Sequence, residues 1–213
     1  MRTCIYIDGF NLYYGSLKNS SYKWLDVKAL SQNILSSEND IVKIKLFTAR
    51  VKPTKTDQTA HLRQNAYLRA LKATIPELEI IFGHFLQHPV HMPLANDRGK
   101  VIYTNDKPEF VRVCKREEKG SDVNLAVHLL NDAWSNEYDC GVVISNDSDL
   151  AEAMRLVKEQ DGKVIGVISP YSKVSKELTQ QSHFQRTIPK VVLENSQLPI
   201  TIEGTKLRKP DTW

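Results

Sequence analysis

The sequence predicts an α/β protein, with a single doubly wound parallel sheet and helices on both faces. Two observations predict this fold: short runs of β-branched and apolar residues recur along the chain, and segments with apolar residues at helical spacing lie between them. Strands that alternate with helices require right-handed crossovers, which cover both faces of a parallel sheet. At 213 residues, the chain is long enough for one domain with a sizeable hydrophobic core.

Five strands are expected, because short β-branched runs are typical of buried strands. In chain order they are residues 3–7, 41–49, 78–85, 141–145 and 163–168. Four helices are expected, with apolar residues at helical spacing, over residues 27–35, 57–74, 121–134 and 149–160. Pro76 closes the second of these helices, and Gly162 follows the fourth as a stop signal.

Two segments depart from this alternation. Residues 84–118 are polar and rich in turn residues, with strand-like pieces near 101–103 and 110–114, so we expect an inserted hairpin or flap there. Residues 193–213 form a polar tail that we expect to be peripheral or disordered. The predicted organisation is therefore one domain over residues 1–192, followed by that tail.

The formal net charge of +4 fits a polyanionic partner such as nucleic acid, without requiring one. Cys4, Cys114 and Cys140 are far apart, which argues against a structural zinc site or a disulfide framework and fits a reducing compartment. Asp8 interrupts a short N-terminal apolar run, so no signal peptide is expected. No apolar stretch of the sequence is long enough to cross a bilayer. We expect a cytoplasmic protein with no membrane partner, and the sequence leaves a homo-oligomer open.

Aspartates follow two of the predicted strands. Asp8 comes directly after the first strand, and Asp147 and Asp149 come just after the fourth. The carboxyl ends of parallel strands line one crevice, where ligands bind, so these side chains are expected at the same edge of the sheet. Asp122 stands in the first turn of the third helix, and it reaches that edge only if the chain arrives from the edge side.

Each of these four aspartates alone has a structural explanation, as a helix cap or a turn residue. Together they would repel one another unless a cation offsets their charge. Carboxylate oxygens are hard ligands that select Mg²⁺ or Mn²⁺, and such an ion would polarise a phosphoryl oxygen and activate water. The sequence therefore predicts a divalent metal site.

Three stretches of the sequence, YIDGFNLYY, EEKGSDVNLAVHLL and VVISNDSDL, resemble the three motifs of the NYN domain, in its LabA-like branch. That family belongs to the PIN-like nucleases, and the resemblance covers residues 3–190 with the motifs in family order. It implies a doubly wound parallel sheet and an acidic site that uses Mg²⁺ or Mn²⁺ to hydrolyse RNA. By position, it implies that Asp8, Asp122, Asp147 and Asp149 are the catalytic, metal-binding carboxylates.

The same resemblance implies supporting roles. Asn11 would hold Asp8 or a substrate phosphate, and Ser145 matches the family's Ser/Thr at the strand end. Two positions depart from the family pattern: Asn146 replaces a frequent glycine, and His128 replaces a frequent second aspartate. His128 would make the metal site weaker or pH-sensitive; the alternative is a surface histidine on a polar helix face.

The expected partner is nucleic acid, either single-stranded or structured RNA. Lys119 is close enough in sequence to Asp122 to reach a scissile phosphate. Tyrosines near the first motif, among them Tyr13 and Tyr14, either stack on unpaired bases or pack internally.

Two other functional classes are alternatives. One is a catalytically weak or inactive PIN-like module that binds RNA or a protein partner. The other is a different phosphotransfer enzyme, which the residues disfavour. A haloacid-dehalogenase-type phosphatase needs an aspartate where this chain has Phe10, and a topoisomerase-primase-type site needs a glutamate where it has Asp8.

Overall fold

A computed structural model describes residues 1–160 and 162–213. Its central sheet has seven strands in the order β6-β3-β2-β1-β7-β8-β9. The strands are β1 (Arg2–Asp8), β2 (Asp40–Ala49), β3 (Leu78–Pro93), β6 (Phe110–Lys119), β7 (Cys140–Ile144), β8 (Val164–Ser169) and β9 (Phe184–Thr187). All neighbouring strands pair in parallel except β3 and β6, which are antiparallel. The predicted α/β fold with a mostly parallel sheet is confirmed.

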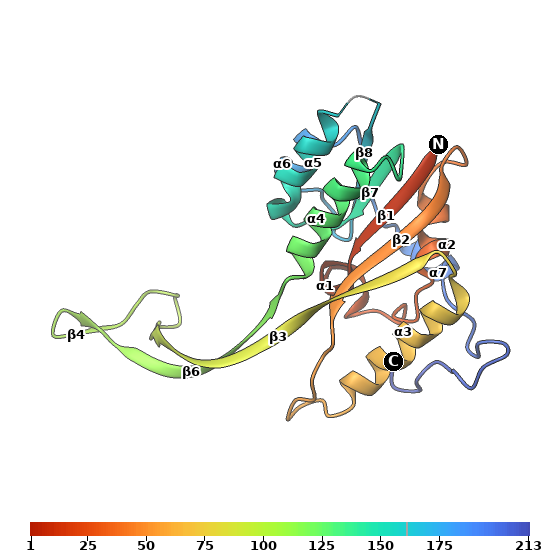
Figure 1. The fold of residues 1–213 in the computed structure, drawn as a ribbon. Coiled ribbons are helices and arrows are strands. Elements are labelled where there is room, and N and C mark those ends of the chain that lie inside the picture. The colour runs from red at the N-terminus through yellow and green to blue at the C-terminus, as the bar shows by residue number, and fades with distance from the viewer. Residues whose placement is uncertain (161) are drawn as a thin grey trace.

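Helices cover both faces of this sheet (Figure 1). They are α1 (Gly9–Leu12), the π-helical turn η1 (Tyr13–Leu17), α2 (Val27–Ile34), α3 (Ala60–Thr74), α4 (Ser121–Trp134), the 3₁₀ turn η2 (Ser148–Leu150), α5 (Ala151–Lys158), α6 (Lys176–Gln181) and α7 (Lys190–Asn195). Side chains from α1, α2, α3 and α7 share one core, and those from α4, α5 and α6 share the other. Among the described residues, no helix combines the length and the apolar content needed to span a bilayer.

Strand β1 shows how the sheet supplies both cores. Ile5 and Ile7 pack in the core beneath α2 and α3, whereas Cys4 and Tyr6 pack in the core beneath α4 and α5. Successive side chains of a strand point to opposite faces, so one strand serves both layers. Every residue of β1 after Arg2 is buried, as expected for a central strand of a parallel sheet that helices cover on both sides.

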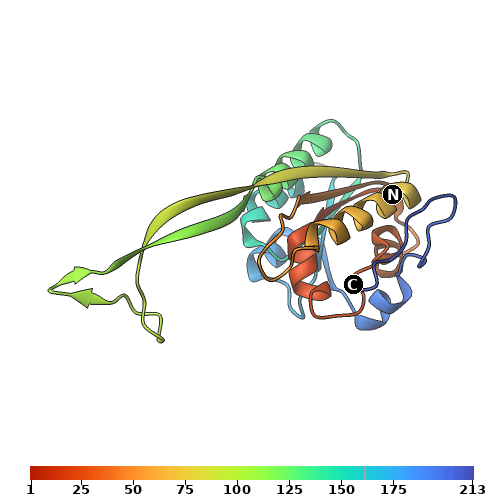
Figure 2. The ribbon, with the colours of Figure 1, turned by 90° about the horizontal axis from the view of Figure 1, so that it is seen from below.

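A long two-stranded arm projects from the body (Figures 1 and 2). It is formed by β3 and β6, which pair from His84 opposite Lys119 out to Pro93 opposite Phe110. The short strands β4 (Tyr103–Thr104) and β5 (Lys107–Pro108) pair near its tip. The inserted hairpin expected around residues 84–118 is confirmed.

The arm determines where α4 begins. Because β6 runs antiparallel to β3, it returns the chain to the carboxyl ends of the parallel strands, and α4 starts there at Ser121. The backbone at the end of β6 and the start of α4 passes close to Gly83 of β3. A Cβ at position 83 would lie 2.6 Å from the carbonyl oxygen of Lys119 and 3.0 Å from the backbone nitrogen of Ser121. A glycine is therefore needed where the returning strand meets the helix.

The tail from residue 193 onward packs against the body. Leu198 is 4% exposed and Ile202 is 3% exposed, and both belong to the core that contains α2 and α3. The ring centroid of Trp213 lies 5.9 Å from that of Trp24 and 5.1 Å from that of Tyr67. The expectation of a peripheral or disordered tail is wrong for these apolar residues, whereas the proposed division at residue 192 stays a prediction.

Candidate functional site

Asp8 is the last residue of β1 and the N-cap of α1. Its carboxylate accepts two hydrogen bonds: Oδ1 from the backbone N–H of Asn11, at 2.9 Å, and Oδ2 from the hydroxyl of Ser145, at 2.9 Å. The residue is only 4% exposed. Burial raises the pKa of Asp8, and these hydrogen bonds work in the opposite direction. The carboxylate is thus fixed in position within a poorly solvated environment.

The segment after β7 is tied to the segment after β1. The hydroxyl of Ser145 accepts a hydrogen bond from the backbone N–H of Asp147, at 3.1 Å. The backbone N–H of Asn146 donates to the side-chain oxygen of Asn11, at 2.9 Å. The Asn146 side chain in turn accepts from the backbone N–H of Ser175, at 2.8 Å. These bonds hold the ends of two neighbouring strands in fixed register, so Asn11 orients both Asp8 and the loop that carries Asp147.

Asp122 joins these aspartates from the first turn of α4. One carboxylate oxygen from each of Asp8, Asp122 and Asp147 lies within 4.8 Å of the other two. The pKa of Asp122 is raised to about 6, first by burial and then by the charges of Asp8 and Asp147. The three carboxylates therefore repel one another unless a proton or a cation lies among them.

Asp149 lies outside this group of three in the part of the chain that the structure describes. It is exposed, and its backbone N–H donates to Oδ1 of Asp147, at 3.1 Å. Its charge is the last of several that raise the pKa of Asp122, so it contributes to the same negative field. Its role as a metal ligand stays a prediction.

Among the described residues, His128 lies outside the group formed by Asp8, Asp122 and Asp147, in a polar network on one face of the sheet. Its Nδ1 is 3.0 Å from Nζ of Lys45, and Nζ of Lys45 is 2.6 Å from Oδ2 of Asp132. The hydroxyl of Tyr6 donates to the same oxygen of Asp132, at 2.7 Å. Position 128 is about 240° around a regular helix from position 122, which explains why the two side chains diverge. His128 is half-buried in this network, in contrast to both interpretations made from the sequence.

The three aspartates lie on the wall of an open cleft of about 350 Å³. It is lined by Asp8, Phe10, Asn11, Tyr14, Phe85, Glu118, Ser121, Asp122, Asp147 and Tyr171. Lys119 is outside this lining; its side chain is half exposed, and its Nζ lies 3.5 Å from Oε2 of Glu117.

Sequence reasoning missed Glu118. Its carboxylate accepts hydrogen bonds from the backbone N–H of Ser121, at 3.2 Å, and from the Ser121 hydroxyl, at 2.7 Å. It thereby caps the start of α4 and adds to the charges that raise the pKa of Asp122. An acidic residue three positions before the predicted helix start was the signal that could have identified it.

Three comparisons with known proteins bear on this site. The family model of the NYN domain matches residues 2–188. A curated protein named 6-hydroxy-3-succinoylpyridine 3-monooxygenase HspA, from Pseudomonas putida, is 30% identical over an alignment of 238 residues, which spans 100% of this chain and 75% of that protein. A solved structure from Vibrio parahaemolyticus, of a protein of unknown function (VPA0982), has a TM-score of 0.54 at 14% identity and covers 92% of this chain and 96% of its own. At that identity, the last likeness concerns the fold alone.

Proposed function

The chain belongs to the NYN domain family of PIN-like proteins, and from this premise we propose that it is a divalent-metal-dependent nuclease that hydrolyses phosphodiester bonds in RNA. The observation that carries the proposal is the convergence of Asp8, Asp122 and Asp147 at one edge of the sheet. Each comes from a different element, and a separate structural feature places each one there. A capping role alone would not require the three to meet.

The donor set fits a hard divalent cation such as Mg²⁺ or Mn²⁺. All three groups are carboxylates, the ligands that such ions prefer. Among the described residues, none of the three forms an ion pair with a lysine, arginine or histidine within 4.0 Å. Their mutual repulsion therefore lacks a protein counter-charge, which supports a cation as the missing partner.

When bound, the cation supplies polarisation of a phosphoryl oxygen and activation of water. The protein's own part is to hold its ligands still. Each carboxylate oxygen of Asp8 accepts one hydrogen bond, from the Asn11 N–H or from the Ser145 hydroxyl. An ionised carboxylate oxygen has a second lone pair that stays available for a cation. Asp8 can thus be oriented by the protein and bind a cation at the same time, which reduces the reorganisation needed on binding.

The arm supplies positive charge beside the cleft. The guanidinium of Arg116 lies 4.7 Å from the ring centroid of Phe85, which lines the cleft. Lys119 was expected from sequence to contact the scissile phosphate, but neither Lys119 nor Arg116 is among the residues that line the cleft. Arg116 lies over Phe85 and shares a strand face with Glu118, and both of these residues line the cleft. We therefore assign the phosphate contact to Arg116, with Lys119 contributing to the surrounding field.

A second candidate function is an activity on a small heteroaromatic compound. The name of the Pseudomonas relative describes a monooxygenase of a substituted pyridine. The observation that favours this candidate is a cavity of about 600 Å³ next to the acidic cleft, a size within the usual range for small-molecule sites.

Cleavage of a labelled single-stranded RNA by purified protein tests the proposal. Wild-type protein should cleave in Mn²⁺ or Mg²⁺ and stop in EDTA, and Asp147→Asn should abolish cleavage while its melting curve stays cooperative. Asp106→Asn, in an exposed turn of the arm, is the matched control and should cleave like wild type. Binding of RNA without cleavage in either metal would instead support an inactive module.

A further inference from the structure

A second, larger cavity adjoins the acidic cleft. Its volume is about 600 Å³, and it lies between η1, α3 and the loop that joins β2 to α3. Phe10, Tyr14 and Phe85 line both the cavity and the cleft, so these three aromatic side chains lie at the boundary between them. The ring centroids of Phe10 and Phe85 are 5.7 Å apart in an edge-to-face arrangement.

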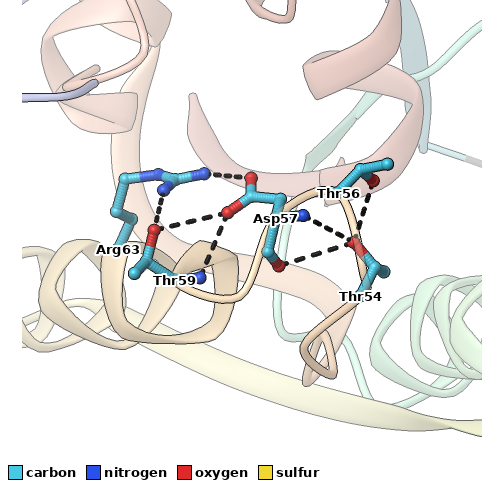
Figure 3. Close-up of polar contacts among 5 residues, drawn as sticks. All are labelled: Thr54, Thr56, Asp57, Thr59 and Arg63. Carbon is cyan, nitrogen blue, oxygen red and sulfur yellow. Dashed lines mark hydrogen bonds and ion pairs between the residues drawn. The ribbon is translucent and has the colours of Figure 1, made fainter.

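One wall of the cavity is a loop held in shape by its own polar contacts, as Figure 3 shows. The Asp57 carboxylate pairs with Arg63 and accepts hydrogen bonds from the backbone N–H and the hydroxyl of Thr59, at 3.2 and 3.3 Å. The backbone N–H of Asp57 donates to the hydroxyl of Thr54, at 3.0 Å. The wall is therefore formed before any ligand arrives, which lowers the entropic cost of binding.

The chemistry of the cavity suits a flat ring that carries an anionic group. Leu12, Leu17 and Leu68 are buried apolar side chains along its inner surface, and the half-buried Tyr13 adds an aromatic ring. Aromatic rings are the usual platform for unpaired bases.

Arg63 is paired with Asp57, but other cations that line this cavity lack acidic partners among the described residues. Lys18, Lys52 and Arg116 line it, and among the described residues none of them forms an ion pair within 4.0 Å. Nζ of Lys18 lies 5.0 Å from the ring centroid of Tyr14, which lines both the cavity and the cleft. Unpaired cations beside an aromatic wall match a phosphate attached to a base.

We propose that this cavity is a nucleotide subsite, which takes the base of the nucleotide next to the cleaved bond while the attached phosphate faces Lys18, Lys52 and Arg116. The inference rests on the proposed nuclease function and names part of its substrate contact. The shared residues Phe10, Tyr14 and Phe85 support it, because an RNA chain whose base occupied the cavity would need to pass only these side chains to reach the three aspartates.

Calorimetric titration in EDTA tests the subsite without any cleavage. The probes are uridine and adenosine 5′-monophosphate, ribose 5-phosphate, which has the phosphate but no base, and nicotinate, a small heteroaromatic acid. At least one nucleotide should bind wild-type protein at least about fivefold more tightly than ribose 5-phosphate, the lower end of what one stacked base contributes. Equal affinities of both nucleotides and ribose 5-phosphate would overturn the proposal.

Variants assign the binding to this cavity. Tyr13→Ser should reduce the nucleotide affinity to that of ribose 5-phosphate, whereas Tyr13→Phe should retain it. Tyr103→Ser removes an exposed tyrosine from the arm and should change nothing. Arg116 is half-buried on the arm, outside both hydrophobic cores, and Arg116→Gln should weaken the binding of nucleotide and of ribose 5-phosphate by the same factor. This variant tests the phosphate contact even if Tyr13→Ser fails to fold. Unchanged nucleotide binding by folded Tyr13→Ser or by Arg116→Gln would contradict the assignment.

The outcomes separate this inference from the nuclease proposal. Selective nucleotide binding by a protein that never cleaves RNA would support the subsite and overturn the nuclease. Metal-dependent cleavage together with equal binding of both nucleotides and ribose 5-phosphate would support the nuclease and overturn the subsite. Tighter binding of nicotinate than of both nucleotides would also overturn the nucleotide assignment, and it would favour the second candidate function.

Discussion

Ser145 donates a hydrogen bond to Asp8 across 137 positions of the chain, with 2.9 Å between the hydroxyl oxygen and Oδ2. The same hydroxyl accepts from the backbone N–H of Asp147, at 3.1 Å. One buried side chain therefore connects two of the three carboxylates that we propose as metal ligands. Ser145 is uncharged, yet its hydrogen bonds set the spacing between Asp8 and Asp147.

Ser145→Ala should both destabilise the protein and weaken metal binding. The change leaves Oδ2 of Asp8 and the N–H of Asp147 without their partner, and an unsatisfied buried polar group costs about 1–3 kcal/mol. Urea denaturation measures the loss of stability, and calorimetric titration with Mn²⁺ measures the loss of affinity. Ser148→Ala, in the exposed turn three residues later, is the control. If both variants behaved like wild type, the bridging hydroxyl would have no role.

Asp122→Asn should stabilise the metal-free protein at pH 7. The pKa of Asp122 is raised from 3.8 to about 6 in the folded state, so its contribution to stability is fully present below pH 3.8 and is lost as the pH rises through 6. A shift of this size corresponds to ~3 kcal/mol at 1.36 kcal/mol per pH unit. Solvent screening of this half-exposed carboxylate reduces the expected gain to roughly 1–2 kcal/mol.

Denaturation in EDTA at several pH values measures this gain. The stability difference between Asp122→Asn and wild type should grow between pH 4 and pH 7, and Asp106→Asn should show no such trend. A constant stability difference across this pH range would mean that burial and neighbouring charges do not destabilise the ionised form of Asp122.

Metal affinity should fall as the pH drops through about 6. A proton and a cation compete for the Asp122 carboxylate, whose pKa is about 6, so each unit of pH below that value should weaken binding by up to about tenfold. Calorimetric titration with Mn²⁺ between pH 5 and pH 8 provides the measurement. An affinity that stays flat over this range would exclude Asp122 from the ligand set.

His128→Asp should leave the metal affinity unchanged. The imidazole contacts Lys45 rather than the acidic group, so a carboxylate at this position would add to the Lys45–Asp132 pair. The sequence pattern alone suggested the opposite result, because the family often has an aspartate here. Titration of wild type and variant with Mg²⁺ distinguishes the two expectations, and tighter binding by the variant would show that position 128 reaches the metal.

The strand ends could be located from the sequence, and with them Asp8 and Asp147. Short β-branched runs followed directly by an aspartate are a local signal, and parallel pairing brings such ends together. Asp122 could not be placed in the same way. Its position depends on β6, whose antiparallel pairing with β3 returns the chain to the carboxyl edge. The sequence indicated an inserted hairpin in this segment, but only the fold shows that its second strand ends at that edge, where α4 begins.

Two other features could not be predicted from the sequence either. A Cβ at Gly9 would lie 2.8 Å from the carbonyl oxygen of Phe47, so a glycine is needed there because α1 closely approaches β2. The tail from residue 193 is polar on average, and only the fold shows that Leu198 and Ile202 fill a core position. Contacts between distant segments decide both cases.

Anomalous diffraction from crystals soaked in Mn²⁺ is the most direct test of the proposed metal site. We predict one manganese peak among Asp8, Asp122 and Asp147, with carboxylate oxygens at roughly 2.0–2.3 Å, and loss of that peak in crystals of Asp147→Asn. A fully soaked crystal with no peak among these three carboxylates, or with its manganese bound elsewhere, would contradict the claim that this cluster is a metal site.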